Sequence, residues 1–332
     1  MRVGTLCYAT DQGLGILAKS FYDAGIVTDA VVVKHSSRVT HYDWYPESKT
    51  TPSNFINMPA VADLLSKVDA MLFFETPFYW NIIDMCRDKG IPTFMMPMYE
   101  CMPKELPATS DYFICPSLLD LDYYPDNSIY LPVPVNVPWK QRTEAKVFVH
   151  NSGHGGLRGR NGTIELLQAM QYVQSPIKLI LRSQDPISNT IKLDPRITLR
   201  MGNTPYNELW EEGDVFVFPE KFNGLSLPLQ EARASGMLVM STDRFPMNTW
   251  LPRPPLIRSK GWVRAAVSGR CHEFEEAILD PKQIAERIDE YYGRDITQYS
   301  LEGKEWAETM TWEKLAPKYR DILANGVPSP CV

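Results

Sequence analysis

Two stretches of the sequence combine residue types that bind phosphate groups and sugar hydroxyls. The first is the turn 219–226, which follows an apolar run at 215–218 and leads to Glu231. Pro228 and Gly236 suit the start and the end of a helix behind this turn. Unpaired N–H groups at a helix N-terminus attract anions, and a carboxylate accepts hydrogen bonds from hydroxyls. The stretch therefore suits a phosphate with an attached sugar, and its alternative is a plain strand–turn–helix connection.

The second stretch is a glycine-rich loop, 153–162, between a strand-like run and a helical pattern that begins at Thr163. Glycines let the backbone approach a phosphate closely, and arginines pair with phosphate oxygens in bidentate fashion. The glycines do not follow the order of a dinucleotide site, and no P-loop G-K-[ST] is present. We expect a diphosphate-binding loop, with a flexible surface loop as the alternative. The residues expected to contact the diphosphate are Gly153, Gly155, Gly156, Arg158, Arg160 and, at the end of the next strand, Arg182.

In the first half of the chain, candidate site residues stand where short apolar runs end. The carboxyl ends of parallel strands meet at one edge of a sheet, where ligands bind. We expect a second site there, in which Glu75 or Glu100 orients a substrate hydroxyl. The alternative is that both acids are helix caps or solvated loop residues. The residues at these strand ends are Gly13, Leu14, Gly15, Glu75, Tyr99 and Glu100.

The order of elements predicts two α/β domains with doubly wound parallel sheets. Short apolar runs alternate with amphipathic stretches of helical length, and the alternation restarts near Lys146. The proline-rich stretch 131–138 is typical of an interdomain linker. We expect an N-terminal domain over 1–140, a second domain over 141–310 and a last helix over 311–332. A cleft between two such domains is the natural ligand site.

Composition and charge exclude several classes of protein. The 332 residues are 44% apolar and 22% charged, and the net charge of −6 provides no general attraction to nucleic acid or anionic lipid. The six cysteines contain no C-x-x-C pair and the five histidines no H-x-x-x-H pair, which argues against a disulfide framework or a zinc site. Neither a signal peptide nor a membrane-spanning run is evident. We expect a cytoplasmic protein that uses no metal and no cofactor.

The second half resembles the retaining glycosyltransferases of the GT-B fold, in particular family 4 (glycosyl transferases group 1). The order of a strand ending in Pro219, a turn, Glu231-Ala232, Gly236 and a closing strand at 238–241 matches that family. Thr311-Trp312-Glu313 is similar to the family's final Ser/Thr-Trp-Glu, which opens a helix that crosses back to the first domain. The first half is similar only in layout. The resemblance implies two Rossmann-like domains that face a cleft.

The resemblance also implies roles for residues of the turn. Glu231 matches the glutamate that holds the ribose hydroxyls of a nucleoside-diphosphate sugar. A second family glutamate is replaced here by Asn223, and Glu220 can take its role only if the turn is rebuilt. The backbone N–H groups expected to face the donor are those of Gly224, Leu225 and Ser226.

The implied reaction moves a sugar to an acceptor hydroxyl with retention at the anomeric carbon and without a metal ion. Asn161-Gly162 stands in place of the family's Lys-Gly pair, so the positive charge at the diphosphate falls to Arg158, Arg160 or Arg182. Asp120-Leu121-Asp122 has the spacing of a metal-binding D-x-D motif, but its Tyr- and Pro-rich surroundings predict a solvated turn.

The donor is expected to be a UDP-sugar that carries a hexose or a pentose. The acceptor stays open among a saccharide, a small molecule and a hydroxylated base in DNA, and no integral membrane contact is expected. Two other functions also stay open. A nucleotide-sugar epimerase of the same fold would convert its substrate without an acceptor, and a non-catalytic binding protein would explain the loss of the glutamate at Asn223.

Overall fold

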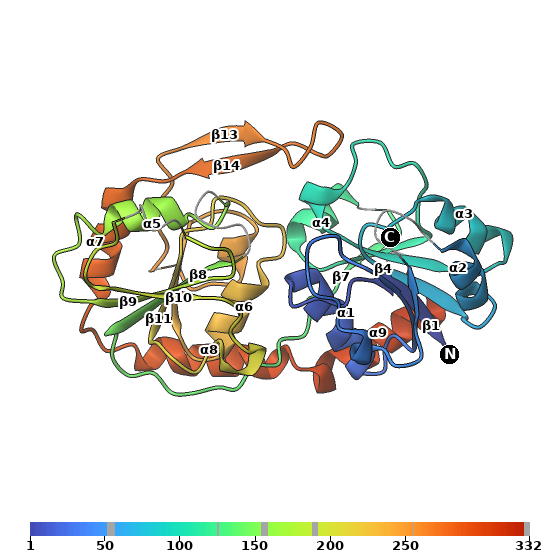
Figure 1. The fold of residues 1–332 in the computed structure, drawn as a ribbon, viewed down its shortest axis with the longest axis horizontal. Helices are drawn as coiled ribbons and strands as arrows, with labels where there is room; N and C mark the ends of the chain where they lie inside the picture. The colour runs from blue at the N-terminus through green and yellow to red at the C-terminus, as the bar shows by residue number, and fades with distance from the viewer. Residues whose placement is uncertain (52–56, 125, 154–158, 188–191, 254, 329–332) are drawn as a thin grey trace. The chain divides into compact units, whose positions relative to one another are not determined.

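The computed structural model describes residues 1–51, 57–124, 126–153, 159–187, 192–253 and 255–328. The chain forms two compact units (Figure 1). Unit 1 contains Met1–Val133, Ala266–His272 and Trp312–Val332, and unit 2 contains Pro134–Ala265 and Glu273–Thr311. Gly155, Gly156 and Arg158 lie outside the described residues.

These units differ from the domains expected from the sequence. The division falls at Val133, within the proline-rich stretch, and the short segment Ala266–His272 belongs to unit 1. Backbone hydrogen bonds explain the second difference. The N–H of His272 donates to the carbonyl of Met102 at 3.1 Å, and that of Lys104 donates to the carbonyl of Arg270 at 2.9 Å. Such long-range pairing leaves no pattern in the local sequence.

Unit 1 is built on a sheet of seven parallel strands in the order β3-β2-β1-β4-β5-β6-β7. The chain leaves β1 and β4 in opposite directions along the sheet, so the topological switch point lies between these two strands. The strands are β1 (Val3–Cys7), β2 (Asp29–Val33), β3 (Lys49–Thr51), β4 (Ala70–Glu75), β5 (Thr93–Pro97), β6 (Tyr112–Cys115) and β7 (Ser128–Tyr130). The helices are α1 (Gly13–Asp23), α2 (Met58–Leu65), α3 (Asn81–Asp88), α4 (Leu118–Tyr123) and α9 (Trp312–Asn325).

Unit 2 repeats this plan with five parallel strands in the order β10-β9-β8-β11-β12. Its switch point lies between β8 and β11. The strands are β8 (Val147–Gly153), β9 (Lys178–Ser183), β10 (Ile197–Met201), β11 (Val215–Phe218) and β12 (Leu238–Ser241). The helices are α5 (Thr163–Ala169), α6 (Leu227–Ala234), α7 (Pro281–Tyr291) and α8 (Thr297–Thr309).

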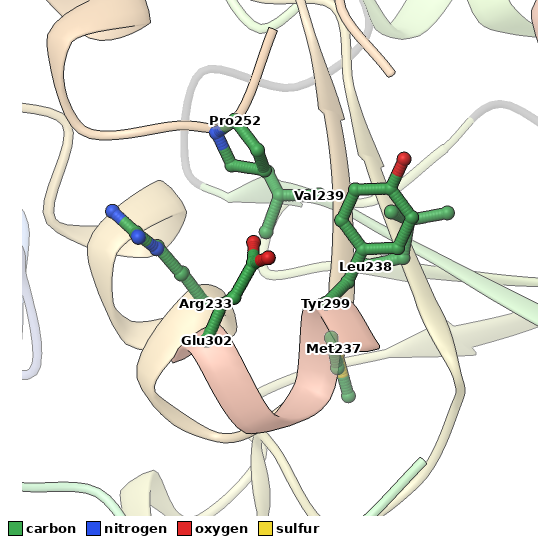
Figure 2. A pocket seen from close by; sticks show the side chains of 7 residues that line it. All are labelled: Arg233, Met237, Leu238, Val239, Pro252, Tyr299 and Glu302. Carbon is green, nitrogen blue, oxygen red and sulfur yellow. The ribbon is translucent and has the colours of Figure 1, made fainter. Parts of the chain in front are cut away.

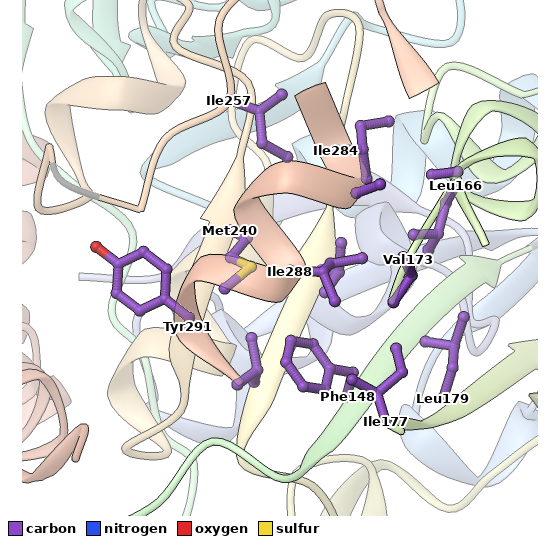
Figure 3. Close-up of a cluster of buried hydrophobic side chains, with 14 of the residues drawn as sticks. Phe148, Leu166, Val173, Ile177, Leu179, Met240, Ile257, Ile284, Ile288 and Tyr291 are labelled. Carbon is purple, nitrogen blue, oxygen red and sulfur yellow. The ribbon is translucent and has the colours of Figure 1, made fainter. Parts of the chain in front are cut away.

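The apolar strands of unit 2 are buried on both faces, which explains their continuous hydrophobic sequence. Side chains on one face of the sheet, such as Phe148, pack with α5 and α7 around Leu166 and Ile288 (Figure 3). Side chains on the other face, such as Val149, pack against α6 through Leu229. The strand order and pairing confirm the prediction of two parallel α/β sheets. Helices cover both faces of the sheet in unit 2, so the strands between them need apolar side chains on both faces.

A separate two-stranded antiparallel sheet, β13 (Gly261–Ala265) and β14 (Phe274–Ile278), was not expected. Phe222 of unit 2 stacks on Phe274 of this hairpin with ring centroids 3.9 Å apart. The hairpin therefore packs against the turn that follows β11.

Candidate functional site

Residues 159–162 of the glycine-rich loop lie against the turn after β11, at the switch point of unit 2. The N–H of Lys221 donates to the carbonyl of Arg160 at 2.7 Å. A Cβ on Gly162 would lie 2.2 Å from the carbonyl oxygen of Pro219, and Gly162 has a φ of +70°. Only glycine fits this position, because a side chain would both clash and strain the backbone. The two stretches thus form one structural feature.

Glu220 is the centre of a hydrogen-bonded network under this turn. Its side chain is fully buried, and its two oxygens accept hydrogen bonds from the Asn223 amide and the Ser226 hydroxyl, both at 2.6 Å. Ser226 has a φ of +43°, which is rare for a residue with a side chain. The network holds Ser226 in this conformation at the N-terminus of α6.

Asn223 and Glu220, the two residues considered for the role of the family's first glutamate, are hydrogen-bonded to each other within the turn. The side-chain oxygen of Asn223 accepts hydrogen bonds from the N–H groups of Leu225 at 3.1 Å and Ser226 at 2.9 Å. These two N–H groups, expected to face a donor, therefore bind Asn223 within the turn. Gly224 lies between Asn223 and Leu225 at the tip of the turn.

Arg160 lies beside the same network. Its Nε is 3.8 Å from a carboxylate oxygen of Glu220, and 46% of its side chain is exposed. The buried carboxylate of Glu220 thus lies beside an arginine whose side chain is about half exposed. Gly153, at the end of β8, has a φ of +60° and lies beside Asn161, whose amide donates to the carbonyl of Ser152 at 2.9 Å.

Glu231 lies on α6 directly behind this turn and is 8% exposed. The hydroxyl of Tyr206 donates a hydrogen bond to its Oε1 at 2.7 Å. Burial raises the pKa of Glu231 to about 7, and the Tyr206 hydroxyl acts against this rise because it stabilises the carboxylate. Nothing in the sequence pattern points to Tyr206, since it lies 25 residues from its partner.

Arg182 has a different position from the one expected of a phosphate ligand. It is 4% exposed, and its guanidinium donates to the carbonyl of Leu209 at 2.6 Å. Burial lowers its pKa, although Glu212 lies 3.9 Å away. Arg182 therefore anchors the segment after β10, whereas Arg160 lies beside the turn.

The edge of unit 1 brings Gly13, Leu14, Gly15 and Glu75 to neighbouring strand ends. A Cβ on Gly15 would lie 2.2 Å from the carbonyl oxygen of Thr10, so glycine allows the first turn of α1 to pack on the loop after β1. Glu75 has a φ of +66°, and the N–H of Thr76 donates to the carbonyl of Phe74 at 2.8 Å. This γ-turn with positive φ is rare and strained, which is typical of functional positions.

Glu100 and Tyr99 lie in a 3₁₀ turn, Tyr99–Cys101, and are 1% and 4% exposed. The neighbouring Asp120 is fully buried, so the expectation of a solvated D-x-D turn is wrong. Asp120 lies in the first turn of α4 and accepts a hydrogen bond from the Tyr99 N–H at 2.8 Å. Burial raises the pKa of Asp120 to about 7, and the charge of Glu100 contributes in the same direction.

A group of aromatic and acidic side chains lies in and beside the loop after β1. His41 and Asp11 are 2.9 Å apart, and Trp44 stacks on the His41 ring with centroids 4.7 Å apart. Tyr8 packs edge-on to His35, and burial with the charge of Glu75 raises the pKa of Tyr8. The N–H of His41 donates to the carbonyl of Ala9 at 2.8 Å, which ties this group to the loop after β1.

No family model matches the chain, and no curated protein matches it in sequence. Its fold does match solved structures. HepE from Anabaena in complex with UDP gives a TM-score of 0.69 at 10% identity, over 98% of this chain and 100% of that chain. This chain has the GT-B fold. A glycosyltransferase from Rickettsia africae ESF-5 gives 0.69 at 12% identity, over 98% and 99% of the chains.

The lipopolysaccharide outer core galactosyltransferase WaaB, in its apo form, gives a TM-score of 0.63 at 12% identity over 98% and 99% of the chains. Identities this low establish the GT-B fold alone, so the activity has to be argued from the residues. Within the described ranges, no three His, Cys, Asp or Glu side chains are grouped to hold a metal ion. None of the helices described is both long and apolar enough to cross a bilayer.

A small pocket in unit 2 is lined by residues other than those described above. Arg233, Glu302 and Tyr299 point toward it from α6 and α8 (Figure 2). Its volume is about 10 Å³, which is enough for one water molecule. The pocket is far too small for a sugar or a nucleotide.

Proposed function

We propose that this protein transfers a sugar from a nucleoside-diphosphate sugar to an acceptor hydroxyl, with retention at the anomeric carbon and without a metal ion. The observation that supports this most is the buried carboxylate of Glu231, directly behind the Glu220 network at the switch point of unit 2. A carboxylate there can accept hydrogen bonds from ribose hydroxyls, in the region where α/β sheets bind nucleotides.

The leaving diphosphate gains negative charge as the glycosidic bond breaks. Arg160 is our candidate for stabilising this charge, because its half-exposed guanidinium lies beside the turn. Gly153, Gly224 and the loop residues outside the described ranges complete the proposed diphosphate site. Solved HepE structures contain UDP and UDP-glucose, which favours UDP as the donor nucleotide and a hexose over a pentose.

On the acceptor side, we favour Glu75 over Glu100 as the carboxylate that orients the attacking hydroxyl. Glu75 is half-buried at the strained end of β4, next to the switch point of unit 1, whereas Glu100 is 1% exposed. Gly13, Leu14 and Gly15 would shape the acceptor pocket, with Tyr99 at its side. A saccharide, a small molecule or a hydroxylated base in DNA fits this proposal.

The proposal is tested with UDP-, GDP- and ADP-glucose by measuring the nucleoside diphosphate released without an acceptor. We expect slow hydrolysis of one donor, and a loss of about tenfold or more in Glu231→Ala and Arg160→Ala, because each removes a charged contact to the donor. Glu286→Ala and Arg258→Ala, at exposed positions, serve as controls. Melting temperatures show whether each variant is folded.

Three results would contradict the proposal. Wild-type turnover in both Glu231→Ala and Arg160→Ala would exclude the assigned donor site. Formation of an epimer of the nucleotide sugar would instead identify an epimerase, and tight nucleotide binding without any turnover would identify a binding protein.

A further inference from the structure

Tyr206 is the described residue whose hydroxyl contacts Glu231, and the proposed function gives it no role. It lies in a 3₁₀ turn, Tyr206–Glu208, and its hydroxyl donates to Oε1 of Glu231 at 2.7 Å. The ring is 38% exposed, while the carboxylate it contacts is almost fully buried. A half-exposed tyrosine therefore reaches into the expected ribose site from its rim.

Two buried arginines hold the segment that carries Tyr206. Arg142 donates to the carbonyl of Trp210 at 2.7 Å, and Arg182 donates to that of Leu209 at 2.6 Å. Both arginines are less than 5% exposed, at 3% and 4%. Burying two guanidinium groups against carbonyls of one short segment is costly unless their hydrogen bonds form, so the segment has one preferred position.

Trp210 completes this arrangement. Its indole packs edge-on to Phe216 of β11 with centroids 5.2 Å apart, and its buried N–H has no hydrogen-bond partner among the described residues. The hydrogen bond that the structure shows from this segment to Glu231 is therefore that of Tyr206. Tyr206 does not change charge between pH 6 and 9, since burial raises its pKa above the usual value.

We propose that Tyr206 is a positioning residue for nucleotide recognition: it binds Oε1 of Glu231 and so directs the other carboxylate oxygen to the ribose hydroxyls of the donor. This inference rests on the proposed function. It predicts that the tyrosine acts through the charged carboxylate, because an ionised Glu231 accepts hydrogen bonds from both Tyr206 and the ribose.

The test is the dissociation constant of UDP, GDP and ADP, measured by calorimetry at pH 7 and pH 9 for the wild type and Tyr206→Phe. The substitution removes only the hydroxyl, which lowers the pKa of Glu231 in the wild type. The carboxyl of the variant therefore stays protonated to a higher pH. We expect binding to be about fivefold weaker at pH 7, since a rise of one unit from a pKa of about 7 lowers the charged fraction from about one half to about one tenth. We expect a smaller loss at pH 9, where the carboxylate is charged in both proteins and only its positioning differs.

A matched control is Tyr172→Phe, which removes a hydroxyl from a 40% exposed tyrosine elsewhere in unit 2. It should bind like the wild type at both pH values. A second readout is the preference for UDP over 2′-deoxy-UDP, which should fall in Tyr206→Phe because the carboxylate is less well directed to the 2′-hydroxyl.

The outcomes separate this inference from the proposed function. If the wild type binds one diphosphate and Tyr206→Phe binds it equally at pH 7, Tyr206 has no positioning role. A loss of affinity without any change in the preference for UDP over 2′-deoxy-UDP also overturns the inference, because the tyrosine would then not direct the carboxylate to the 2′-hydroxyl. If the wild type binds none of the three diphosphates, the proposed function itself fails.

Discussion

At the scale of single residues, the turn 219–226 depends on the buried carboxylate of Glu220, which accepts hydrogen bonds from two side chains of the same turn. Glu220 binds Asn223 and Ser226, and Asn223 in turn binds the N–H groups of Leu225 and Ser226. Asn223 thus belongs to the hydrogen-bonded network within the turn. Glu231 behind the turn and Arg160 beside it are the two charged residues that the proposed function uses for the donor.

Glu220→Gln tests this network. A glutamine offers one acceptor oxygen where the carboxylate offers two, so a buried donor loses its partner. We expect the free energy of unfolding to fall by about 1–3 kcal/mol. Glu308→Gln, at an exposed position on α8, is the control and should be neutral. Equal stability of the two variants in urea unfolding would show that the network contributes nothing.

The raised pKa of Asp120 predicts that the stability of the protein depends on pH. Its pKa is raised to about 7 by burial, from a model-peptide value of 3.8, so the unfolded state releases this proton at lower pH than the folded state. Its contribution to stability is therefore present below pH 4 and lost as pH rises toward 7. Asp120→Asn should gain in melting temperature relative to the wild type between pH 5 and pH 8. Asp122→Asn, at the exposed neighbour, should show a constant difference, and the same constancy in Asp120→Asn would contradict the assignment.

At the scale of elements, the strand ends could be predicted from the sequence but the contacts between their loops could not. Continuous apolar runs such as Val215–Phe218 identify strands buried on both faces, and residues after them are placed at the edge by topology alone. Arg182 has the right residue type and strand position, yet its burial is decided by the distant carbonyl of Leu209. Tyr206 meets Glu231 for the same long-range reason, which no local pattern records.

Gly162→Ala tests the contact between Gly162 of the glycine-rich loop and Pro219 of the turn 219–226. The new Cβ would lie 2.2 Å from the Pro219 carbonyl oxygen, so the loops must separate. Gly90→Ala is a matched control, because Gly90 has a similar φ, +66° against +70°, with no atom within 4 Å of an added Cβ. We expect Gly162→Ala to cost about 1–3 kcal/mol more than the control, together with weaker nucleotide binding. Equal costs in the two variants would mean that the loops do not depend on this contact.

At the scale of the whole molecule, the chain returns to its first unit after completing the second. Tyr319 of α9 is fully buried in unit 1, where its ring packs edge-on to Phe21 with centroids 4.9 Å apart. Its hydroxyl donates to the carbonyl of Pro132 at 3.0 Å. The similarity of Thr311-Trp312-Glu313 to a family motif is the only sign of this return in the sequence, since periodicity shows a helix but not its partner.

Tyr319→Ala should therefore destabilise unit 1, although the residue follows unit 2 in the sequence. Loss of a buried aromatic ring costs about 3–5 kcal/mol, whereas Tyr319→Phe loses only the hydroxyl and should cost about 1 kcal/mol. Tyr79→Ala, at a 45% exposed tyrosine of unit 1, is the control and should be nearly neutral. Urea unfolding followed by fluorescence measures all three, and a Tyr319→Ala variant as stable as the control would contradict the role given to α9.

The most direct test of the proposed function is the product formed from an α-linked nucleotide sugar in the presence of a metal chelator. Proton NMR of the wild type with UDP-, GDP- and ADP-glucose identifies the first sugar released and its anomer. We predict that α-glucose is released first from one donor, that chelation has no effect, and that Glu231→Ala abolishes the reaction. Release of β-glucose, formation of an epimer or a requirement for a metal ion would contradict metal-independent glycosyl transfer with retention.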